Sequence, residues 1–372
     1  MTLSLMDGNE ATAWGALDAG CRFFAGYPIT PATNIFATML KLLPPSGGIV
    51  LQGEDEIASI GYCLGASMTG FKAMTASSGP GISLFSEHIS FAIGSEIPLV
   101  IVDVQRLGPS TGYATKGADG DIQFLRWGNS GGMPPIVLAP VCLRDCYTLT
   151  MHAFNLAEAF RTPVFIASHK EIAMTRESVD LARLERPPVA ERLPHPPDRS
   201  YLPFRADSER GVPYFAPIGG PTISRQTSST HGEDGYITSD PATISALVER
   251  LRRKVEARVR EFSFFESFHA KGSRTLLLTY GVTSRAARTA SKELAAQGKP
   301  VSHLVLKTLW PVPEELLRSE ARDYPRIVVV EANLGQYVRE VERVLRTKTV
   351  DFLGEMNGTL ITPARVKEAV RG

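Results

Sequence analysis

The sequence has few cysteines, almost no net charge and no long apolar run. Four cysteines in 372 residues are too few and too scattered for a disulfide framework or a four-cysteine cluster site. Lys and Arg number 40 against 39 Asp and Glu, so the net charge of +1 does not point to nucleic acid or anionic lipid. No apolar run approaches the roughly 20 residues of a membrane span, and no secretory signal opens the chain. We expect a globular, cytoplasmic protein with no nucleic-acid or membrane partner.

Short apolar runs, in contrast, are abundant. Hydrophobic residues make up 43% of the chain, enough for a full core, and its length favours two domains. Over the first ~170 residues the runs alternate with helical stretches and Gly-rich connections, which is typical of an α/β domain with a mostly parallel sheet. We therefore place a first domain at residues 1–175. Its expected strands are residues 48–51, 72–76, 98–104, 135–139 and 163–168.

The alternation is lost in residues 176–240, which are rich in Pro, Arg, Gly and Ser and are typical of a long crossover or linker. A second α/β domain is expected at residues 241–372. It opens with a charged amphipathic helix over residues 242–262, for which Ser239 or Asp240 offers a cap. Strands are expected at 274–280, 301–307 and 327–331, and helices at 284–297, 313–318 and 336–346, in a compact Rossmann-like unit.

Residues 26–33 (GYPITPAT) end an apolar segment and open a helix expected at residues 34–42. Backbone N–H groups and the hydroxyls of Thr30 and Thr33 therefore gather at a helix N-terminus, which suits an oxyanion or a carboxylate. A Pro-stiffened turn with a Thr cap explains the same residues without any ligand. The residues alone leave both interpretations open.

Three adjacent carboxylates, residues 54–56 (EDE), lie between an expected strand and a helix over residues 57–68. The helix macrodipole favours acidic residues at this place, which explains them without a specific role. The helix itself is unusual, because Gly61, Gly65 and Thr69 recur on one face. Another backbone or a flat ring can approach such a face closely.

Two further segments follow expected strands. Residues 77–81 (SSGPG) form a polar, Gly-rich loop at the carboxyl end of a strand, where open α/β sheets bind ligands; no Gly-Lys-Ser/Thr closes it, so it is not a P-loop. Arg106 follows the clearest buried strand, and its guanidinium can either clamp a substrate carboxylate or pair with an acid such as Asp103. Because all of these segments lie at strand ends of one sheet, we expect them to converge on one pocket.

Four ordered motifs together resemble the alpha subunit of 2-oxoacid:ferredoxin oxidoreductases, and the 2-oxoglutarate enzymes are the most similar members. The resemblance covers nearly the whole chain. It implies a pyrimidine-binding thiamine-diphosphate domain followed by a transketolase C-terminal-like α/β domain. The motifs are residues 27–31 (YPITP), 53–58 (GEDEIA), 77–84 (SSGPGISL) and 102–112 (VDVQRLGPSTG), with further similarity at 227–240 and 333–345.

The resemblance also implies roles for single residues. Glu56 is implied to hydrogen-bond N1′ of the thiamine aminopyrimidine; it is chosen over Glu54 because it stands nine residues before Gly65, as in family members. Thr30 is implied to donate to the substrate carboxylate or carbonyl, and Arg106 to fix that carboxylate near the reacting carbon. The other implied residues are Tyr27, Pro28, Ile29, Ser78, Gly79 and Pro80 for the cofactor, and Lys116 and His231 for the distal carboxylate of 2-oxoglutarate.

Partners are implied as well, because the chain lacks several of the family's motifs. The Gly-Asp-Gly motif of the diphosphate and magnesium site has no match, residues 117–121 (GADGD) being the nearest string, and no Cys-x-x-Cys is present for iron–sulfur clusters. We therefore expect no metal site in this chain and a beta subunit that carries the diphosphate, Mg²⁺ and a 4Fe–4S cluster. A gamma subunit, a ferredoxin-like delta subunit as a further candidate, and ferredoxin complete the expected partners.

The implied reaction is oxidative decarboxylation of a 2-oxoacid, first 2-oxoglutarate, to acyl-CoA and CO₂ with reduction of ferredoxin, or the reverse carboxylation. Coenzyme A is the implied co-substrate. Two alternatives are a subunit of a non-redox thiamine-diphosphate decarboxylase or carboligase, and a noncatalytic scaffold of the same fold. Leu107 and residues 113–116 depart from the pattern frequent in relatives, and residues 333–336 (NLGQ) resemble a turn at a helix start with a subunit-contact or CoA-side role.

Overall fold

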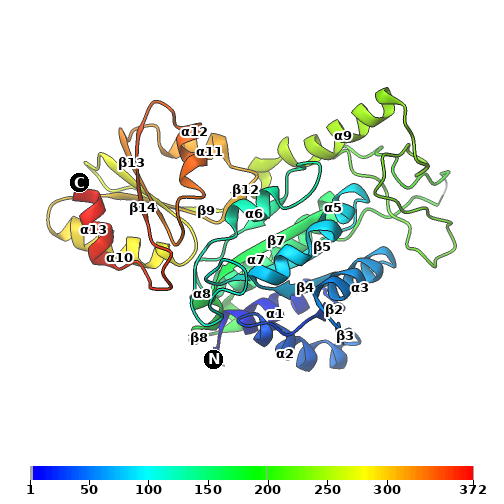
Figure 1. Cartoon of the computed structure of the whole chain (residues 1–372), viewed down its shortest axis with the longest axis horizontal. Coiled ribbons are helices and arrows are strands. Elements are labelled where there is room, and N and C mark those ends of the chain that lie inside the picture. The colour runs from blue at the N-terminus through cyan, green and yellow to red at the C-terminus, as the bar shows by residue number, and fades with distance from the viewer. Residues whose placement is uncertain (1–2, 198, 372) are drawn as a thin grey trace.

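The computed structural model describes residues 3–197 and 199–371, in which two large sheets lie side by side (Figure 1). The first sheet has the strand order β12-β6-β7-β5-β4-β2-β3, and all neighbours are parallel except β12 and β6. Its strands are β2 (Phe23–Gly26), β3 (Ile49–Gln52), β4 (Ala73–Ser77), β5 (Leu99–Gln105), β6 (Ile136–Leu138), β7 (Pro163–His169) and β12 (Thr308–Trp310).

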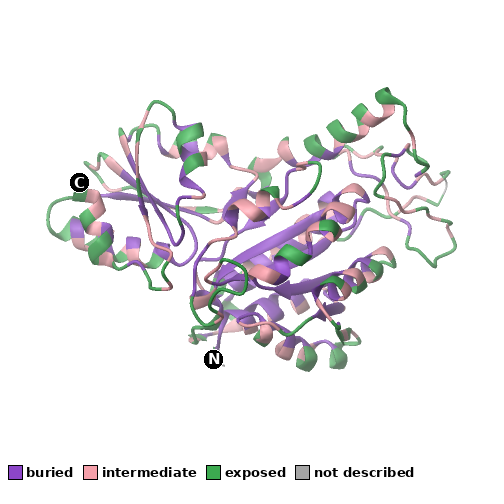
Figure 2. Ribbon diagram, in the orientation of Figure 1, coloured by how far each residue is buried: buried purple, intermediate pink, exposed green. Residues whose placement is uncertain are grey.

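Helices cover both faces of the first sheet, because its central strands are apolar on both sides (Figure 2). Every residue of β5 is buried. Phe24 and Val100 pack with α1, α2 and α7, whereas Phe23 and Ile101 point to the opposite face and pack with α3 and α5. This arrangement is a doubly wound α/β layer. The helices are α1 (Gly8–Asp18), α2 (Thr33–Leu42), α3 (Glu56–Met68), α5 (Ser86–Gly94) and α7 (Leu143–Phe160).

The second sheet has the order β14-β13-β10-β11-β9, parallel except for β9 with β11. One face packs against α10 (Thr283–Ala296) and α13 (Pro363–Arg371), and the other joins the hydrophobic cluster of the first sheet. No helix within residues 3–197 and 199–371 is both long and apolar enough for a membrane span. The strands are β9 (Phe265–Phe268), β10 (Thr275–Thr279), β11 (Ser302–Leu306), β13 (Arg326–Glu331) and β14 (Thr349–Gly354).

Strand β12 connects the second half of the chain to the first sheet. This strand lies in the second half of the sequence, yet it pairs antiparallel with β6 at the edge of the first sheet. Trp310 of β12 is buried, and its Nε1 donates a hydrogen bond of 3.0 Å to the carbonyl of Ile122. The sequence analysis does not predict this strand, and the domain boundaries at residues 175 and 240 stay predictions.

Buried ion pairs fasten the segment between the sheets to the first domain. Arg192 pairs with Glu158 at 2.5 Å, and both side chains are buried. Glu96 is fully buried, and Lys254 and Arg250 of α9 (Pro241–Glu256) bind it at 2.8 and 2.6 Å. Burial alone raises the pKa of Glu96, but the charges of Lys254 and then Arg250 outweigh it and hold the pKa at about 2. The helix expected to reach residue 262 ends at Glu256, and a 3₁₀ turn follows.

Candidate active site

The carboxyl ends of β2, β4 and β5 lie at one edge of the first sheet, and the motifs predicted from the sequence follow these strands or β3 (Figure 1). In the strand register, Gly26 of β2 pairs with Gln52 of β3, and Ser77 of β4 pairs with Asp103 of β5. The four predicted segments therefore start side by side, at the edge where open α/β sheets bind ligands.

The three carboxylates of residues 54–56 have different environments. Asp55 is the N-cap of α3, because its side chain accepts a hydrogen bond of 2.7 Å from the N–H of Ala58. Glu54 is exposed, whereas Glu56 is only 8% exposed. A favourable position at the start of a helix therefore explains Asp55, whereas Glu56 is the carboxylate whose side chain points into the protein.

Glu56 lies against the loop that follows β4. A Cβ atom placed on Gly81 of α4 (Gly79–Leu84) would lie 2.7 Å from Glu56 Oε1 and 2.0 Å from Ser77 Oγ, so only glycine fits there. The hydroxyls of Ser77 and Ser78 are buried, and neither has a hydrogen-bond partner among the residues that the structure describes. Buried polar atoms without partners fit a site that a polar ligand completes.

Arg106 and Thr30 contact each other across this edge. The Arg106 side chain is 6% exposed, and its Nη1 donates a hydrogen bond of 2.6 Å to the carbonyl of Thr30, while its Nε has no partner among the described residues. Burial lowers the pKa of the Arg106 guanidinium, and Asp121 and Glu56 act in the opposite direction. The acids that act on Arg106 are thus Asp121 and Glu56, in place of the Asp103 that the sequence offered as its partner.

The turn after β2 is fixed by a side chain from α1. Asn9 Nδ2 donates a hydrogen bond of 2.9 Å to the carbonyl of Pro31, next to Thr30. The Thr cap expected for the following helix is wrong, because Ala32 is the N-cap of α2 and no side chain caps it. Residues 27–29 are exposed or half-buried. Thr30 meets Arg106 through its backbone carbonyl, so the role of its hydroxyl stays a prediction.

Three acids that the sequence did not single out as site residues lie near one another here: Asp103 and Asp119, which are buried, and Asp121, which is half-buried and acts on Arg106. Burial, reinforced by Asp121 and Asp119, raises the pKa of Asp103 well above its usual value. Burial also raises the pKa of Asp121 to about 6, against the lowering effects of Asp103 and Arg106. Asp103 near the end of the expected strand and the two Asp residues of the string at 117–121 were a signal, but their placement in the fold is not visible in a sequence.

Lys116 lies near the site by its backbone only. Its carbonyl accepts a hydrogen bond of 2.8 Å from the N–H of Leu107, directly after Arg106. The exposed Lys116 side chain lies beside Gly358 of the second domain, where an added Cβ would come within 2.9 Å of it. Its role toward a substrate stays a prediction.

The structure does not bring His231 to Glu56 within one chain. The His231 ring is buried and stacks on Phe204, with ring centroids 3.8 Å apart. The segment before it binds the end of α5, where Gln226 donates to the carbonyl of Ser95. That end of α5 precedes β5, so it lies at the sheet edge opposite Arg106.

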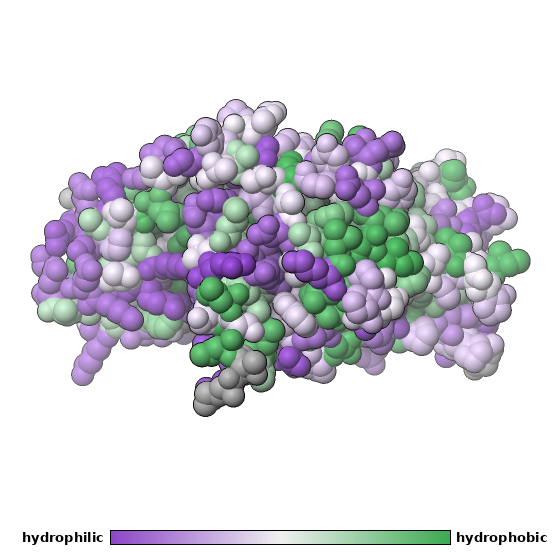
Figure 3. Space-filling view, turned by 90° about the horizontal axis from the view of Figure 1, so that it is seen from below, coloured by the Kyte–Doolittle hydropathy of each residue, from purple (hydrophilic) through white to green (hydrophobic). Residues whose placement is uncertain are grey.

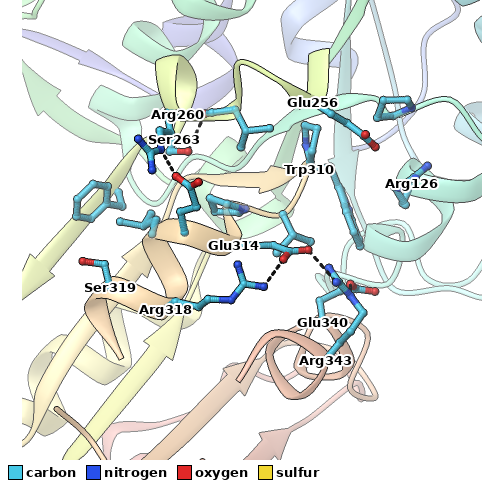
Figure 4. Close-up of a pocket in the computed structure, with 18 of the residues that line it drawn as sticks. Arg126, Glu256, Arg260, Ser263, Trp310, Glu314, Arg318, Ser319, Glu340 and Arg343 are labelled. Atoms are coloured by element: carbon cyan, nitrogen blue, oxygen red, sulfur yellow. Dashed lines mark hydrogen bonds and ion pairs between the residues drawn. The ribbon is translucent and has the colours of Figure 1, made fainter. Parts of the chain in front are cut away.

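A cavity of about 1080 Å³ lies apart from this site, between the two halves of the chain (Figure 4). Arg126 of the first half lines it together with Glu256, Glu314 and Arg343 of the second. Glu314 pairs with Arg318 at 2.5 Å and with Arg343 at 2.8 Å, so much of the lining charge is neutralised within the wall. None of the predicted site residues lines this cavity.

Comparison with protein families assigns the class. The family model described as "Pyruvate flavodoxin/ferredoxin oxidoreductase, thiamine diP-bdg" matches residues 14–250, which contain the whole strand-end site, so the class is that of thiamine-diphosphate-binding chains. The "Pyruvate:ferredoxin oxidoreductase core domain II" model matches residues 274–366. The chain belongs to the pyruvate flavodoxin/ferredoxin oxidoreductase family.

Individual relatives agree with this assignment. The chain is 39% identical to the 2-oxoglutarate synthase subunit KorA of Methanothermobacter thermautotrophicus, over 97% of this chain and 96% of that protein. The 2-oxoglutarate:ferredoxin oxidoreductase of Magnetococcus marinus, solved with 2-oxoglutarate, coenzyme A and succinyl-CoA bound, superposes with a TM-score of 0.92 at 32% identity. That match covers 99% of this chain, which spans 65% of the length of the solved one. A split gene transketolase shares the fold alone, with a TM-score of 0.58 at 15% identity over 98% of this chain and 95% of that one.

Two expectations from the sequence are thereby confirmed. The resemblance based on the four motifs is correct, and so is the fold class of a thiamine-diphosphate-binding α/β domain followed by a transketolase-like α/β domain. The names of the KorA relatives describe subunits, so proteins of this kind work together with other chains.

Proposed function

We propose that this chain is the alpha subunit of a thiamine-diphosphate-dependent 2-oxoacid:ferredoxin oxidoreductase, with 2-oxoglutarate as the first substrate to test. The overall reaction forms a thioester with coenzyme A, releases CO₂ and passes two electrons to ferredoxin, or runs in reverse. The observation that carries this proposal is the buried Glu56 carboxylate, which lies against Gly81 and acts electrostatically on the buried guanidinium of Arg106 at the carboxyl ends of the parallel strands.

The residues present fit the aminopyrimidine end of thiamine diphosphate. Glu56 is positioned to hydrogen-bond N1′, and the unpartnered hydroxyls of Ser77 and Ser78 leave polar atoms free for the ring. Tyr27, Pro28, Ile29, Gly79 and Pro80 are proposed as further contacts. When bound, the cofactor supplies the carbanion chemistry that breaks the bond between the carboxylate and the carbonyl carbon of the substrate.

Arg106 and Thr30 hold the substrate in this proposal. Arg106 Nε, which has no partner within residues 3–197 and 199–371, and a backbone N–H or hydroxyl of Thr30 orient a carboxylate beside the reacting carbon. A guanidinium binds a carboxylate through two parallel hydrogen bonds. Lys116 and His231 remain candidates for the distal carboxylate of 2-oxoglutarate. His231 requires a second chain to bring it to the site, because it lies at the opposite sheet edge of its own.

An apolar face beside Glu56 supports a partner subunit there. On the face of the molecule seen in Figure 3, hydrophobic side chains gather over the end of the first sheet where β3 and α3 lie. Ile49 and Leu51 of the edge strand β3 are 44% and 39% exposed, and Ile57 and Tyr62 of α3 are 44% and 46% exposed. Exposed apolar patches of this kind mark protein interfaces. We propose that the beta subunit covers this face and brings the diphosphate and Mg²⁺ site.

The iron–sulfur cluster is also proposed to lie in the beta subunit. All four cysteines of this chain are free thiols, and Cys21, Cys63 and Cys146 are buried. Burial raises the pKa of Cys21 to about 12, so its thiol resists the deprotonation that metal binding requires. Gamma and ferredoxin-like delta subunits, ferredoxin as the acceptor, and a cytoplasmic location complete the proposal.

We expect the purified chain alone to bind thiamine diphosphate weakly, because the residues for its charged tail belong to the partner. Isothermal calorimetry of the chain alone and of the co-purified complex, with thiamine diphosphate and Mg²⁺, measures the difference. Tight stoichiometric binding to the isolated chain would contradict the shared site.

We expect Gly81→Ala to weaken thiamine diphosphate binding by the complex about tenfold, since overpacking costs about 1–3 kcal/mol. The added methyl group overlaps the places of Ser77 Oγ and Glu56 Oε1, so the carboxylate must move. Calorimetry gives the affinity, and thermal unfolding shows whether the fold is retained. An unchanged affinity in a folded variant would place the cofactor away from Glu56.

The function is tested by co-expression with the neighbouring subunit and a substrate screen. The complex is assayed with coenzyme A, ferredoxin and each of 2-oxoglutarate, pyruvate, 2-oxoisovalerate and an aryl 2-oxoacid. The expected result is ferredoxin reduction with the highest kcat/KM for 2-oxoglutarate. Decarboxylation without electron transfer would support a non-redox enzyme, and no turnover or thiamine binding would support a noncatalytic scaffold.

A further inference from the structure

A turn of the second domain forms hydrogen bonds with a loop of the candidate active site. We call residues 333–336 the Asn333 turn and residues 119–123 the Asp121 loop. Asn333 Nδ2 donates a hydrogen bond of 2.8 Å to the carbonyl of Asp119, and Gln336 Nε2 donates one of 2.5 Å to the carbonyl of Gly120. In return, the N–H of Gln123 donates to Gln336 Oε1 at 2.9 Å and its Nε2 to the Gln336 carbonyl at 2.7 Å.

The Asn333 turn is itself held rigidly. Asn333 Oδ1 accepts hydrogen bonds from the N–H groups of Gly335 and Gln336, at 2.8 and 3.0 Å. The fully buried carboxylate of Glu331 accepts from the hydroxyl of Tyr280 at 2.7 Å and from the N–H of Tyr337 at 2.9 Å. A buried polar network with its partners in place fixes one geometry. The turn is therefore a firm support for the loop it contacts.

The Asp121 loop in turn reaches two residues of the site. The N–H of Asp121 donates a hydrogen bond of 3.1 Å to Gln105 Oε1, at the end of β5. Asp121 Oδ2 would lie 3.8 Å from a Cβ on Gly79, which the cofactor is proposed to contact. Asp121 is also the acid with the largest effect on Arg106. Moving this loop therefore changes the surroundings of both Gly79 and Arg106.

We infer that Asn333 and Gln336 are positioning residues for the substrate site: they hold Asp121 between Gly79 and Arg106, so the second domain sets the geometry in which Arg106 receives a carboxylate. The inference rests on the proposed function, because it assigns Arg106 to the substrate. The second domain thereby acts on the reaction without touching a reactant. Arg126 of α6 (Ile122–Trp127) and Glu340 of α12 (Val338–Val344) line one cavity, so the helices that continue from the loop and the turn also lie together (Figure 4).

Gln336→Ala in the assembled complex is the main test. Loss of its hydrogen bonds is expected to raise KM for every 2-oxoacid about 3- to 10-fold, with a smaller change in kcat, since a hydrogen bond contributes about 0.5–1.5 kcal/mol. Hydrogen–deuterium exchange of the full chain is expected to show faster exchange in the Asp121 loop, a readout that needs no bound cofactor. The matched control is Gln297→Ala, an exposed glutamine of the same domain that contacts Arg371.

The pH profile separates positioning from a general loss of stability. In the wild type, Asp121 is surrounded by Asp103, Asp119 and Arg106, and Glu331 acts on Asp119. The pKa of Asp121 is about 6, so its charge is present above that pH and lost below it. Water that enters beside a released loop favours the charged form. We expect kcat/KM of the wild type to show an inflection near pH 6 from Asp121, and we expect this inflection to move to lower pH in Gln336→Ala and to stay in Gln297→Ala.

A double variant provides a second measurement. Gln123→Ala removes a different hydrogen bond of the same contact, from Gln123 Nε2 to the backbone carbonyl of Gln336, which Gln336→Ala leaves in place. The double variant is therefore expected to raise KM, and to speed exchange in the Asp121 loop, beyond Gln336→Ala alone. Wild-type KM, exchange and pH inflection in a folded Gln336→Ala complex, or a double variant that does not differ from Gln336→Ala, would overturn the inference. If the wild-type complex turns over no 2-oxoacid, the proposed function fails. Faster hydrogen–deuterium exchange in the Asp121 loop of Gln336→Ala would then still show that Gln336 holds this loop in place.

Discussion

Glu56→Gln is expected to lower kcat of the assembled complex by about 100- to 10,000-fold, the range in which a positioned proton-transfer group contributes to enzymes. An amide keeps the shape of the side chain but does not supply the acid that N1′ requires. The buried position against Gly81 leaves no room for another carboxylate to replace it. The measurement is 2-oxoacid-dependent ferredoxin reduction, together with exchange of the C2 proton of bound thiamine diphosphate by NMR.

The neighbouring acid provides the control for this variant. Glu54→Gln makes the same chemical change two residues away on an exposed side chain, and we expect wild-type turnover and C2 exchange. The unfolding temperature of Glu56→Gln should stay close to that of the wild type, because the two side chains have the same volume. Wild-type C2 exchange in Glu56→Gln would refute the assignment of this residue.

Arg106→Ala is expected to reduce kcat/KM about 100- to 1,000-fold for every 2-oxoacid, mainly through KM, because truncating one partner of a buried charge pair costs about 2–5 kcal/mol. Among the residues that the structure describes, Nε of the buried guanidinium has no partner and Nη1 donates to the Thr30 carbonyl, which leaves donors for a carboxylate. Steady-state kinetics with 2-oxoglutarate and pyruvate measure the effect.

Arg106→Lys is the matched comparison, since it keeps the charge and loses the planar fork. We expect it to recover part of the KM and to act alike on both substrates. A loss confined to dicarboxylic substrates would move Arg106 to the distal end of the pocket. An unchanged KM for both substrates would remove Arg106 from the substrate site.

Most strands of the two sheets could be predicted from the sequence, because an apolar strand leaves a local pattern. Continuous apolar runs gave β5 and its parallel neighbours, and the expected strand at 274–280 is β10. The edge strand β12 was missed, since its pairing with β6 joins segments far apart in the chain and has no local signal. β9 and β14 were missed as well. They form the two edges of the second sheet, and apart from Leu353 of β14 their residues are exposed or half-buried.

The sequence allowed a prediction of which segments form the site, because these segments follow neighbouring strands of one parallel sheet. Loops that follow adjacent parallel strands must meet, so the proximity of Glu56, residues 77–81 and Arg106 follows from topology. Which of three neighbouring carboxylates turns inward is decided by the cap at Asp55. The position of the Asp121 loop depends on a turn more than 200 residues later in the chain, and no pattern near Asp121 contains that information.

The antiparallel strand β12 joins the second half of the chain to the first sheet. A fragment that ends at the linker would expose the edge of β6 and the surface that Trp310 and the second sheet cover. Because both sheets share one hydrophobic cluster, neither half retains a complete core after cleavage. We therefore expect the two sheets to unfold in one cooperative transition, and we expect a fusion to another protein to keep its fold only when it contains both sheets.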